Sequence, residues 1–135
     1  MRLPTDLYEE LIGRARAEPE REVCGLLGAR GEVLSHYPIA NTAAEPARRF
    51  SMDPGEQIHA MRRMREREER LFAIYHSHPH SPPRPSPTDL AEAAYPEALY
   101  LIVGLTPVPA LRGYFLKGNE AQEVVLEIGA AGRNG

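Results

Sequence analysis

Two histidines separated by one residue, His76 and His78, follow the best-defined candidate strand of the chain, residues 71–75. Alternate residues of a strand point to the same face, so the two imidazoles can converge on one point. Imidazole suits zinc, and a carboxylate, Asp89, follows eleven residues after His78. Two histidines and one aspartate leave a fourth tetrahedral position for water, as in catalytic zinc sites. Such a water has its pKa lowered to about 7 and can act as a nucleophile.

Other interpretations of the same residues stay open at this point. Histidines on strands commonly serve as surface or hydrogen-bonded side chains, and Ser86-Pro87-Thr88-Asp89 is also typical of a helix start. A helix start there could itself orient Asp89 toward the histidines. Metal-assisted hydrolysis also needs a proton acceptor, for which Glu22 is the candidate. Spacing alone does not distinguish Glu22 from a solvated carboxylate at the start of a strand.

The elements that must position these residues follow from hydrophobic periodicity and from turn residues. Helices are predicted over residues 5–18, 54–70 and 86–94. Strands are predicted over residues 23–27, 33–39, 71–75, 98–105, 110–116 and 124–128, the first two forming a hairpin and the third running into residues 76–78. This order predicts an α/β fold, a single-domain α-β-α sandwich around a mixed, curved β-sheet.

Details within these elements are predicted as well. Thr5 is expected to cap the first helix, and residues 117–120 are expected to turn between two strands. The helical positions expected to face the core are Leu7, Leu11, Ile12 and Ala15 in the first helix and Ile58, Met61 and Met64 in the second.

Composition narrows the functional classes. The net charge of −3 argues against a nucleic-acid or membrane-surface partner. Cys24 is the only cysteine, so an intramolecular disulfide is impossible, and we expect a cytoplasmic protein without a signal peptide or membrane span. Proline is unusually frequent, at 13 of 135 residues, and five of the 13 lie within residues 79–87. This tract separates the histidines from Asp89, so we expect it to form a rigid wall of the site.

The motifs resemble those of a known family. His76-Ser77-His78-Pro79, followed by Ser86-x-x-Asp89, resembles the signature of the JAMM (MPN+) zinc metalloproteases. The segment Glu22-Val23-Cys24-Gly25-Leu26-Leu27-Gly28 resembles the one that carries the family's catalytic glutamate, and Asn41…Phe50-x-x-Asp53-Pro54 is also similar. Together these resemblances extend over roughly residues 5–128. They imply an MPN/cytidine-deaminase-like fold, with one domain over 1–135, its core in 5–128 and a flexible tail over 129–135.

The resemblance also implies roles for individual residues. His76, His78 and Asp89 would bind one zinc ion per chain. Glu22 would be the general acid–base, and Ser86 would donate a hydrogen bond to the oxyanion. Outside these roles, Ser77 is expected to pack on the opposite face of the strand, and His80 is expected to be exposed.

The family hydrolyses peptide or isopeptide bonds after the C-terminal glycines of ubiquitin-like proteins, and the chain resembles its short bacterial members. The resemblance therefore implies a ubiquitin-like sulfur-carrier protein, or its conjugates, as the partner. The alternatives are a non-catalytic MPN scaffold, a RadC-like DNA-associated protein, and a cysteine peptidase that uses Cys24. Pairing at a strand edge would allow a homodimer.

Overall fold

The computed structural model describes residues 1–129 of the chain. Its elements, in chain order, are β1 (Arg2–Leu3), α1 (Thr5–Ala17), β2 (Cys24–Arg30), β3 (Val33–Ile39), α2 (Pro54–Glu66), β4 (Arg70–His78), α3 (Pro87–Glu92), β5 (Leu99–Gly104), β6 (Ala110–Lys117), β7 (Glu120–Val124) and β8 (Glu127–Ile128). Apart from Gly129, the tail expected to be flexible lies outside the described residues. None of the helices in the described range is long and apolar enough to cross a membrane.

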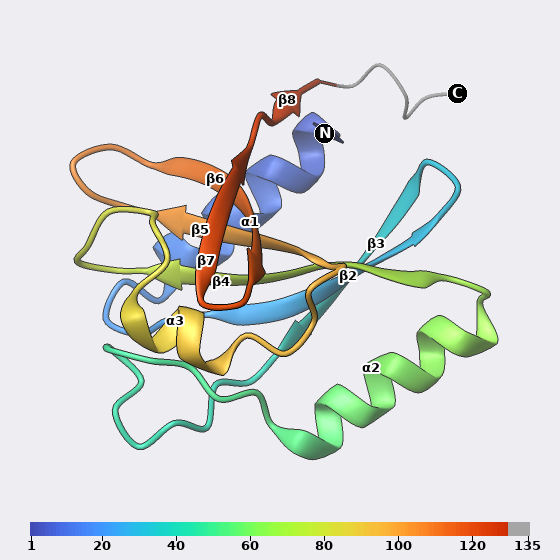
Figure 1. Cartoon of the computed structure of the whole chain (residues 1–135), viewed down its shortest axis with the longest axis horizontal. Coiled ribbons are helices and arrows are strands. Elements are labelled where there is room, and N and C mark those ends of the chain that lie inside the picture. The colour runs from blue at the N-terminus through green and yellow to red at the C-terminus, as the bar shows by residue number, and fades with distance from the viewer. Residues whose placement is uncertain (130–135) are drawn as a thin grey trace.

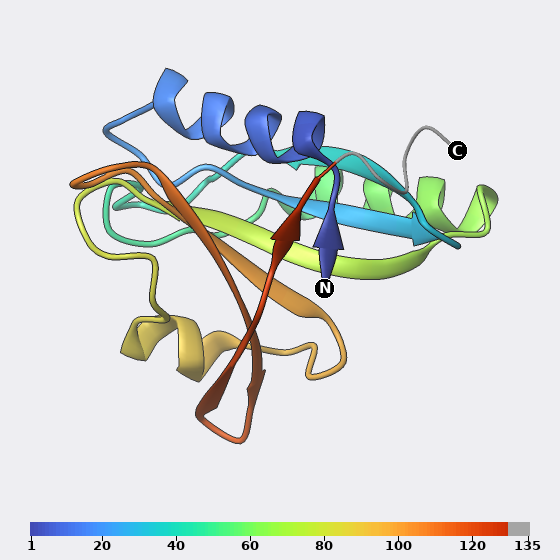
Figure 2. The same cartoon turned by 90° about the horizontal axis from the view of Figure 1, so that it is seen from above.

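A six-stranded sheet in the order β3-β2-β4-β5-β6-β7 forms the middle layer of the molecule. β4 and β5 run parallel, and the other neighbouring pairs run antiparallel, so the sheet is mixed. The sheet is twisted and curved, with α1 on one face and with α2 and α3 on the other (Figures 1 and 2). This arrangement confirms the predicted α-β-α sandwich around a mixed sheet.

The alternation of side chains along β4 decides which face carries the site. Tyr75 packs into the core beneath α1, whereas Ile74 packs into the second core, beneath α2 and α3. His76 and His78 share the face of Ile74, because alternate residues of a strand point the same way. The histidines therefore lie on the α2 and α3 side of the sheet, at the end of β4.

The first helix confirms the predicted apolar stripe but not the predicted cap. All four stripe positions of α1 are buried. The N-cap, however, is Pro4, in an extended conformation, and the main chain of Tyr8 donates to the Pro4 carbonyl at 3.0 Å. Thr5 is thus the first helical residue and makes no capping hydrogen bond, so the prediction of a Thr5 cap was wrong.

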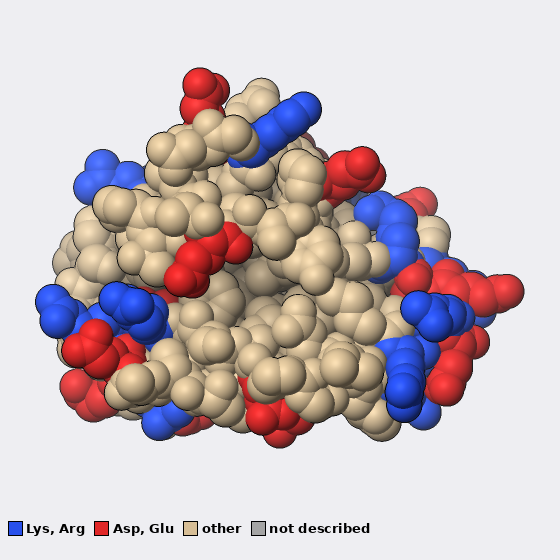
Figure 3. Space-filling view, turned by 60° about the horizontal axis from the view of Figure 1, so that its bottom comes forward, with Lys and Arg blue, Asp and Glu red and all other residues tan. Residues whose placement is uncertain are grey.

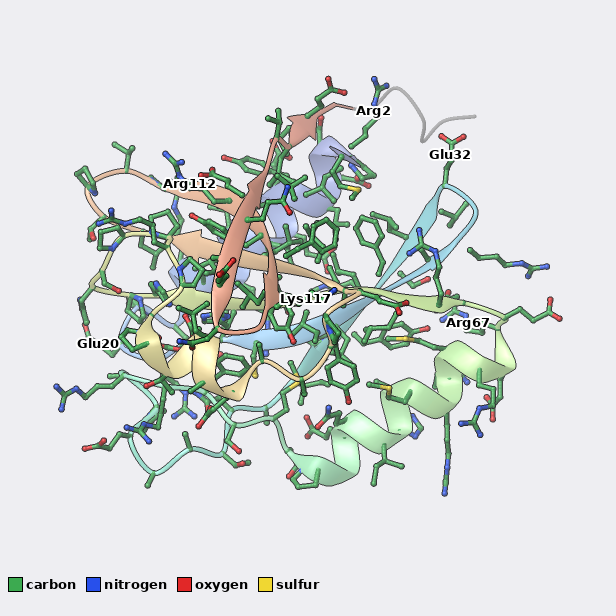
Figure 4. All side chains as sticks on the ribbon, viewed as in Figure 1. Arg2, Glu20, Glu32, Arg67, Arg112 and Lys117 are labelled. Atoms are coloured by element: carbon green, nitrogen blue, oxygen red, sulfur yellow. The ribbon has the colours of Figure 1, made fainter. Side chains whose placement is uncertain are left out.

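The second helix is shorter than predicted, and one of its apolar residues faces outward. It ends at Glu66, with Arg67 as its C-cap (labelled in Figure 4), because Glu68 adopts a left-handed backbone conformation with φ of 58°. Met64 is buried as predicted, but Ile58 is 56% exposed. Ala60 takes the inward position instead, four residues before Met64 and on the same helical face.

The prediction of one last strand over residues 124–128 was also wrong, because β7 ends at Val124 and β8 covers only Glu127–Ile128. The turn over 117–120 forms, with left-handed backbone at Gly118 and Asn119. Because this turn is so tight, β7 starts directly after it, at Glu120, and pairs with β6. The chain then leaves the sheet, and β8 pairs in parallel with β1 as a separate two-stranded sheet.

Candidate metal centre

Three ligand atoms from β4 and α3 converge beside the sheet. His76 Nε2 lies 3.1 Å from His78 Nε2, and Asp89 Oδ2 lies 3.2 Å from each of them. Tetrahedral zinc with bonds of 2.0–2.1 Å needs ligand atoms about 3.3 Å apart, so the spacing of this triangle fits the ion. Within residues 1–129, these three side chains form the one cluster of this kind.

The hydrogen bond that His78 makes leaves its other ring nitrogen able to bind a cation. Its Nδ1 lies 2.8 Å from the carbonyl oxygen of Pro82, which can only accept a hydrogen bond. Nδ1 therefore carries the proton, and in the neutral ring Nε2 presents a lone pair to the centre of the triangle. The Pro82 carbonyl belongs to the proline tract, so this tract, predicted to form a wall of the site, also orients the candidate ligand His78.

Asp89 is brought to the triangle by the start of α3. Ser86 is the N-cap: its hydroxyl accepts a hydrogen bond from the Asp89 main chain at 3.0 Å, and its own main chain donates to Asp89 Oδ2 at 2.8 Å. The predicted helix start and a candidate metal ligand thus coexist in one capping box. Burial alone would raise the pKa of Asp89, but the two imidazoles beside it and the hydrogen bond from the Ser86 main chain outweigh this effect and hold the pKa far below its usual range.

Glu22 lies beside this triangle, two residues before the start of β2. Ser77 accepts a hydrogen bond from the Val23 main chain at 2.9 Å and holds the end of β4 against the residue that follows Glu22. The Glu22 side chain is only 6% exposed, and its Oε1 has no hydrogen-bond partner among residues 1–129. Burial raises the pKa of Glu22 to about 7, a value suited to proton transfer near neutrality.

His76 is supported differently from His78, by a residue for which the sequence suggested no role. Phe50, in the loop between β3 and α2, stacks on the His76 ring with centroids 4.4 Å apart and planes inclined by 22°. His76 Nδ1 is buried and has no hydrogen-bond partner in the described part of the chain. Burial also lowers the pKa of His76, which favours the neutral ring that a metal requires. The family-like Phe50-x-x-Asp53-Pro54 pattern pointed to this segment without showing what it touches.

The remaining motif residues lie where the sequence placed them. Ser77 is fully buried and serves the strand pairing described above. His80 is exposed and lies 3.4 Å from Glu20, which Figure 4 labels on the segment between α1 and β2.

Cys24 does not have the properties of a nucleophile. It is fully buried, its sulfur donates to the Ile39 carbonyl at 3.4 Å, and burial raises the pKa of the thiol to about 12. Cysteine peptidases need a thiolate, so this geometry disfavours the cysteine-peptidase alternative.

A groove of about 670 Å³ lies next to the candidate metal centre. Phe50 lines it and also touches His76, so the groove and the metal triangle share a wall. Apolar side chains from the sheet and the surrounding loops form much of the remaining lining: Leu26, Met52, Ile74, Tyr95 and Tyr100. Figure 3 looks onto this side of the molecule, which is hollowed near its centre and has most of its charged groups toward the two ends.

Comparison with known proteins places this geometry in a family. Residues 4–116 match the model of the prokaryotic homologues of the JAB domain. A desampylase of Haloferax volcanii is 30% identical, over 93% of this chain and 94% of the relative. A Thermus thermophilus protein described as a probable TtuB-protein conjugate cleaving protease is 34% identical, over 93% of this chain and 81% of the relative. A CysO-cysteine peptidase of Mycobacterium tuberculosis is 35% identical, over 73% and 68% respectively.

Solved structures agree with this assignment. The solution structure of a Desulfitobacterium hafniense protein is 34% identical, covers 95% of this chain and 92% of that one, and superposes with a TM-score of 0.81. A JAB1/MPN domain protein of Archaeoglobus fulgidus, 19% identical over 96% and 99% of the two chains with a TM-score of 0.62, shows the same fold. The chain therefore belongs to the prokaryotic JAB-domain family, within the JAMM (MPN+) group that its motifs resemble.

Proposed function

We propose that this chain is a zinc-dependent peptidase or isopeptidase that hydrolyses the bond after the C-terminal Gly-Gly of a ubiquitin-like sulfur-carrier protein. The observation that carries the proposal is the triangle of His76, His78 and Asp89 beside the buried, unpaired Glu22. The names of the relatives, a conjugate-cleaving protease and a CysO-cysteine peptidase, support this substrate class. We also propose that the protein acts in the reducing cytoplasm, as its single cysteine leads us to expect.

His76, His78 and Asp89 would hold one zinc ion per chain. Bound zinc supplies Lewis-acid polarisation of the scissile carbonyl and lowers the pKa of a coordinated water to about 7. The protein's own contribution is to aim the three lone pairs, which the Pro82 carbonyl and the α3 capping box do for His78 and Asp89.

Glu22 would carry the proton. Its carboxylate takes a proton from the attacking water as the water oxygen bonds to the carbonyl carbon, and returns it to the leaving nitrogen as the C–N bond breaks. In the metal-free protein, burial raises the pKa of Glu22 to about 7, so the surroundings of this carboxyl tolerate the protonated form that it must adopt between the two steps. Because Glu22 has little contact with solvent, it exchanges the proton with the substrate more readily than with bulk water.

Ser86 would stabilise the oxyanion. Its hydroxyl oxygen already accepts a hydrogen bond from the Asp89 main chain, and its hydrogen has no acceptor among the described residues. The hydroxyl is therefore free to donate to the carbonyl oxygen as negative charge develops there.

The groove beside Phe50 would hold the C-terminal tail of the substrate. An extended chain ending in two glycines is narrow enough to approach a buried centre, and the groove offers both apolar and polar side chains to the residues that precede the glycines. The bond after the second glycine would then lie at the metal triangle.

Zinc analysis and a glutamate substitution test the proposal together. We expect near-stoichiometric zinc in protein expressed with added zinc, and cleavage of a Gly-Gly-ending ubiquitin-like protein that carries a short C-terminal extension. Glu22→Gln should retain zinc but lose roughly a thousandfold in kcat, since it removes the proton carrier. Asp89→Ala should lose both zinc and activity.

The same assay separates the alternatives. A non-catalytic scaffold predicts no cleavage of any Gly-Gly-ending carrier by zinc-loaded protein. A cysteine peptidase predicts inactivation by thiol alkylation and indifference to chelators. Full activity in Glu22→Gln would remove Glu22 from the mechanism.

A further inference from the structure

We propose that Asn41 is a positioning residue for the reaction: its side-chain amide holds the main chain of Glu22 and the main chain on both sides of Phe50. The inference rests on the proposed role of Glu22 as proton carrier. Asn41 lies just after β3 and is only 8% exposed. Its amide lies at the junction of the β2 start and the loop that approaches His76.

The amide nitrogen of Asn41 faces three main-chain carbonyl oxygens. The distances from Nδ2 are 2.9 Å to Glu22, 3.1 Å to Arg49 and 3.4 Å to Pro46. Carbonyls can only accept, so this nitrogen must be the donor, and its orientation in the site is determined by its neighbours. One donor group thus ties the start of β2 to the loop between β3 and α2.

The amide oxygen of Asn41 also binds the loop between β3 and α2. It accepts hydrogen bonds from the main chains of Ala43 at 2.9 Å and Ser51 at 3.0 Å. Arg49, held through its carbonyl, and Ser51, held through its N–H, are the two neighbours of Phe50. The backbone on each side of Phe50 is therefore fixed by the same side chain, and the Phe50 ring stacks on His76.

The orientation of the Glu22 carboxylate depends on the position of the Glu22 main chain. Oε1 of its carboxylate is buried and has no hydrogen-bond partner among residues 1–129, so no hydrogen bond to that oxygen directs the side chain. Its main chain is held at both ends, because its N–H donates to the Pro46 carbonyl at 2.6 Å and its carbonyl accepts from Asn41. Removing the Asn41 donor should therefore free the main chain that directs this carboxylate, while all three candidate metal ligands stay in the chain.

The Asn41 side chain is needed for its amide, which supplies N–H donors to the three carbonyls and an acceptor to the two main-chain N–H groups. Asn41→Asp keeps the acceptor toward Ala43 and Ser51 but replaces the donor with an oxygen that faces three carbonyls. Asn41→Ser removes most of both interactions without adding charge. Ser35→Ala is the control, because it removes a part-buried side-chain hydrogen bond, from the Ser35 hydroxyl to Glu69, and neither of these residues lines the groove beside Phe50.

The test measures kcat, KM, zinc content and backbone hydrogen exchange in zinc-loaded protein. In Asn41→Asp and Asn41→Ser we expect kcat to fall by about 30-fold or more, since misplacement of a reacting group by 1 Å can cost about a hundredfold. We expect KM within about threefold of wild type, unchanged zinc content under excess zinc, and faster exchange over residues 42–51. Ser35→Ala should keep the wild-type kcat.

A double mutant distinguishes positioning from general destabilisation. If Asn41 acts through Glu22, adding Asn41→Asp to Glu22→Gln should change the residual rate by less than about threefold, because the group being positioned is already gone. An equal loss of kcat in the two backgrounds would overturn the inference, as would wild-type kcat in both folded Asn41 variants. Failure of the proposed function would look different: Glu22→Gln itself would remain fully active.

Discussion

At the scale of single residues, the properties of the candidate site residues depend on contacts with segments that are distant in the sequence. Glu22 looks in sequence like a strand-end carboxylate, yet it is buried beside His78 and Asp89, and its pKa is raised to about 7. His76 looks like its partner His78, yet a phenyl ring supports it where a carbonyl supports the other. Both differences follow from contacts with distant segments, and both can be tested one residue at a time.

The raised pKa of Glu22 predicts a pH-dependent stability in the metal-free protein. Folding raises this pKa from 4.5 to about 7, so the stabilising proton is fully present below pH 4.5 and is lost as the pH rises through 7. Glu22→Gln needs no proton, so above pH 7 the variant should be more stable than wild type, by at most about 3 kcal/mol. Near pH 4.5 the two should match. Urea unfolding of chelator-treated protein at both pH values measures this gap, and a gap independent of pH would contradict the cause given.

Phe50 predicts a loss of zinc affinity without a change in any candidate ligand. Phe50→Leu removes the ring that stacks on His76, and loss of such outer support commonly weakens metal binding by about tenfold. Competition against a colorimetric chelator measures the dissociation constant. Phe115→Leu, a half-buried position packed against the core under α1, is the matched control. Equal weakening in both variants would show that Phe50 acts only through general packing.

At the scale of elements, the proline tract between β4 and α3 forms a wall of the candidate site, and three neighbouring strands hold this wall in place. Its Pro82 carbonyl accepts from His78, and its Pro83 carbonyl accepts from the Tyr114 hydroxyl at 3.0 Å. Gly104, at the end of β5, lies against Pro83 so closely that a Cβ there would come within 2.7 Å of the proline ring. The wall is therefore held from β4, β5 and β6, and α3 starts from it in a defined position.

Gly104→Ala should disturb the metal site from the far side of this wall. The added methyl must push Pro83 outward, which moves the loop that delivers Asp89, so we expect about tenfold weaker zinc binding. Calorimetric titration of metal-free protein with zinc measures this. Gly13→Ala, an α1 position where a Cβ would meet nothing within 4 Å, should bind zinc like wild type. Unchanged affinity in Gly104→Ala would mean that the proline tract yields without moving Asp89.

Local signals predicted some of these elements and not others. The α3 start was predictable, because a capping box operates within four consecutive residues, Ser86 to Asp89. The end of α2 was not, because Glu69 turns inward to accept hydrogen bonds from the Ser35 and Tyr37 hydroxyls of β3, a distant strand. The start of β7 was missed as well, since its polar residues are stabilised by pairing with β6 rather than by burial.

At the scale of the whole molecule, the candidate site exists only in the folded chain. Its candidate ligands come from β4 and α3, and the proposed proton carrier, Glu22, lies two residues before β2, so the unfolded chain has no preformed site. Zinc should therefore bind the native state selectively and stabilise it.

Metal removal should accordingly lower the melting temperature. With free zinc at about a thousand times the dissociation constant, binding contributes about 4 kcal/mol of stability, which for a domain of this size is a shift on the order of 10 °C. Differential scanning calorimetry with zinc and with chelator measures the shift. Asp89→Ala should melt at the same temperature in both conditions. A zinc effect that persists in this variant would place the metal elsewhere.

By itself the sequence determined the α/β class, the spacing of the candidate ligands and the helix start that carries Asp89. Strand alternation, capping and turn chemistry act over a few residues, so these features can be read locally. Only the tertiary structure decided that Glu22 is buried beside the histidines, that Phe50 covers His76, and that Asn41 holds both segments. Those relations depend on strand register and loop packing between segments far apart in the chain, and no local pattern encodes them.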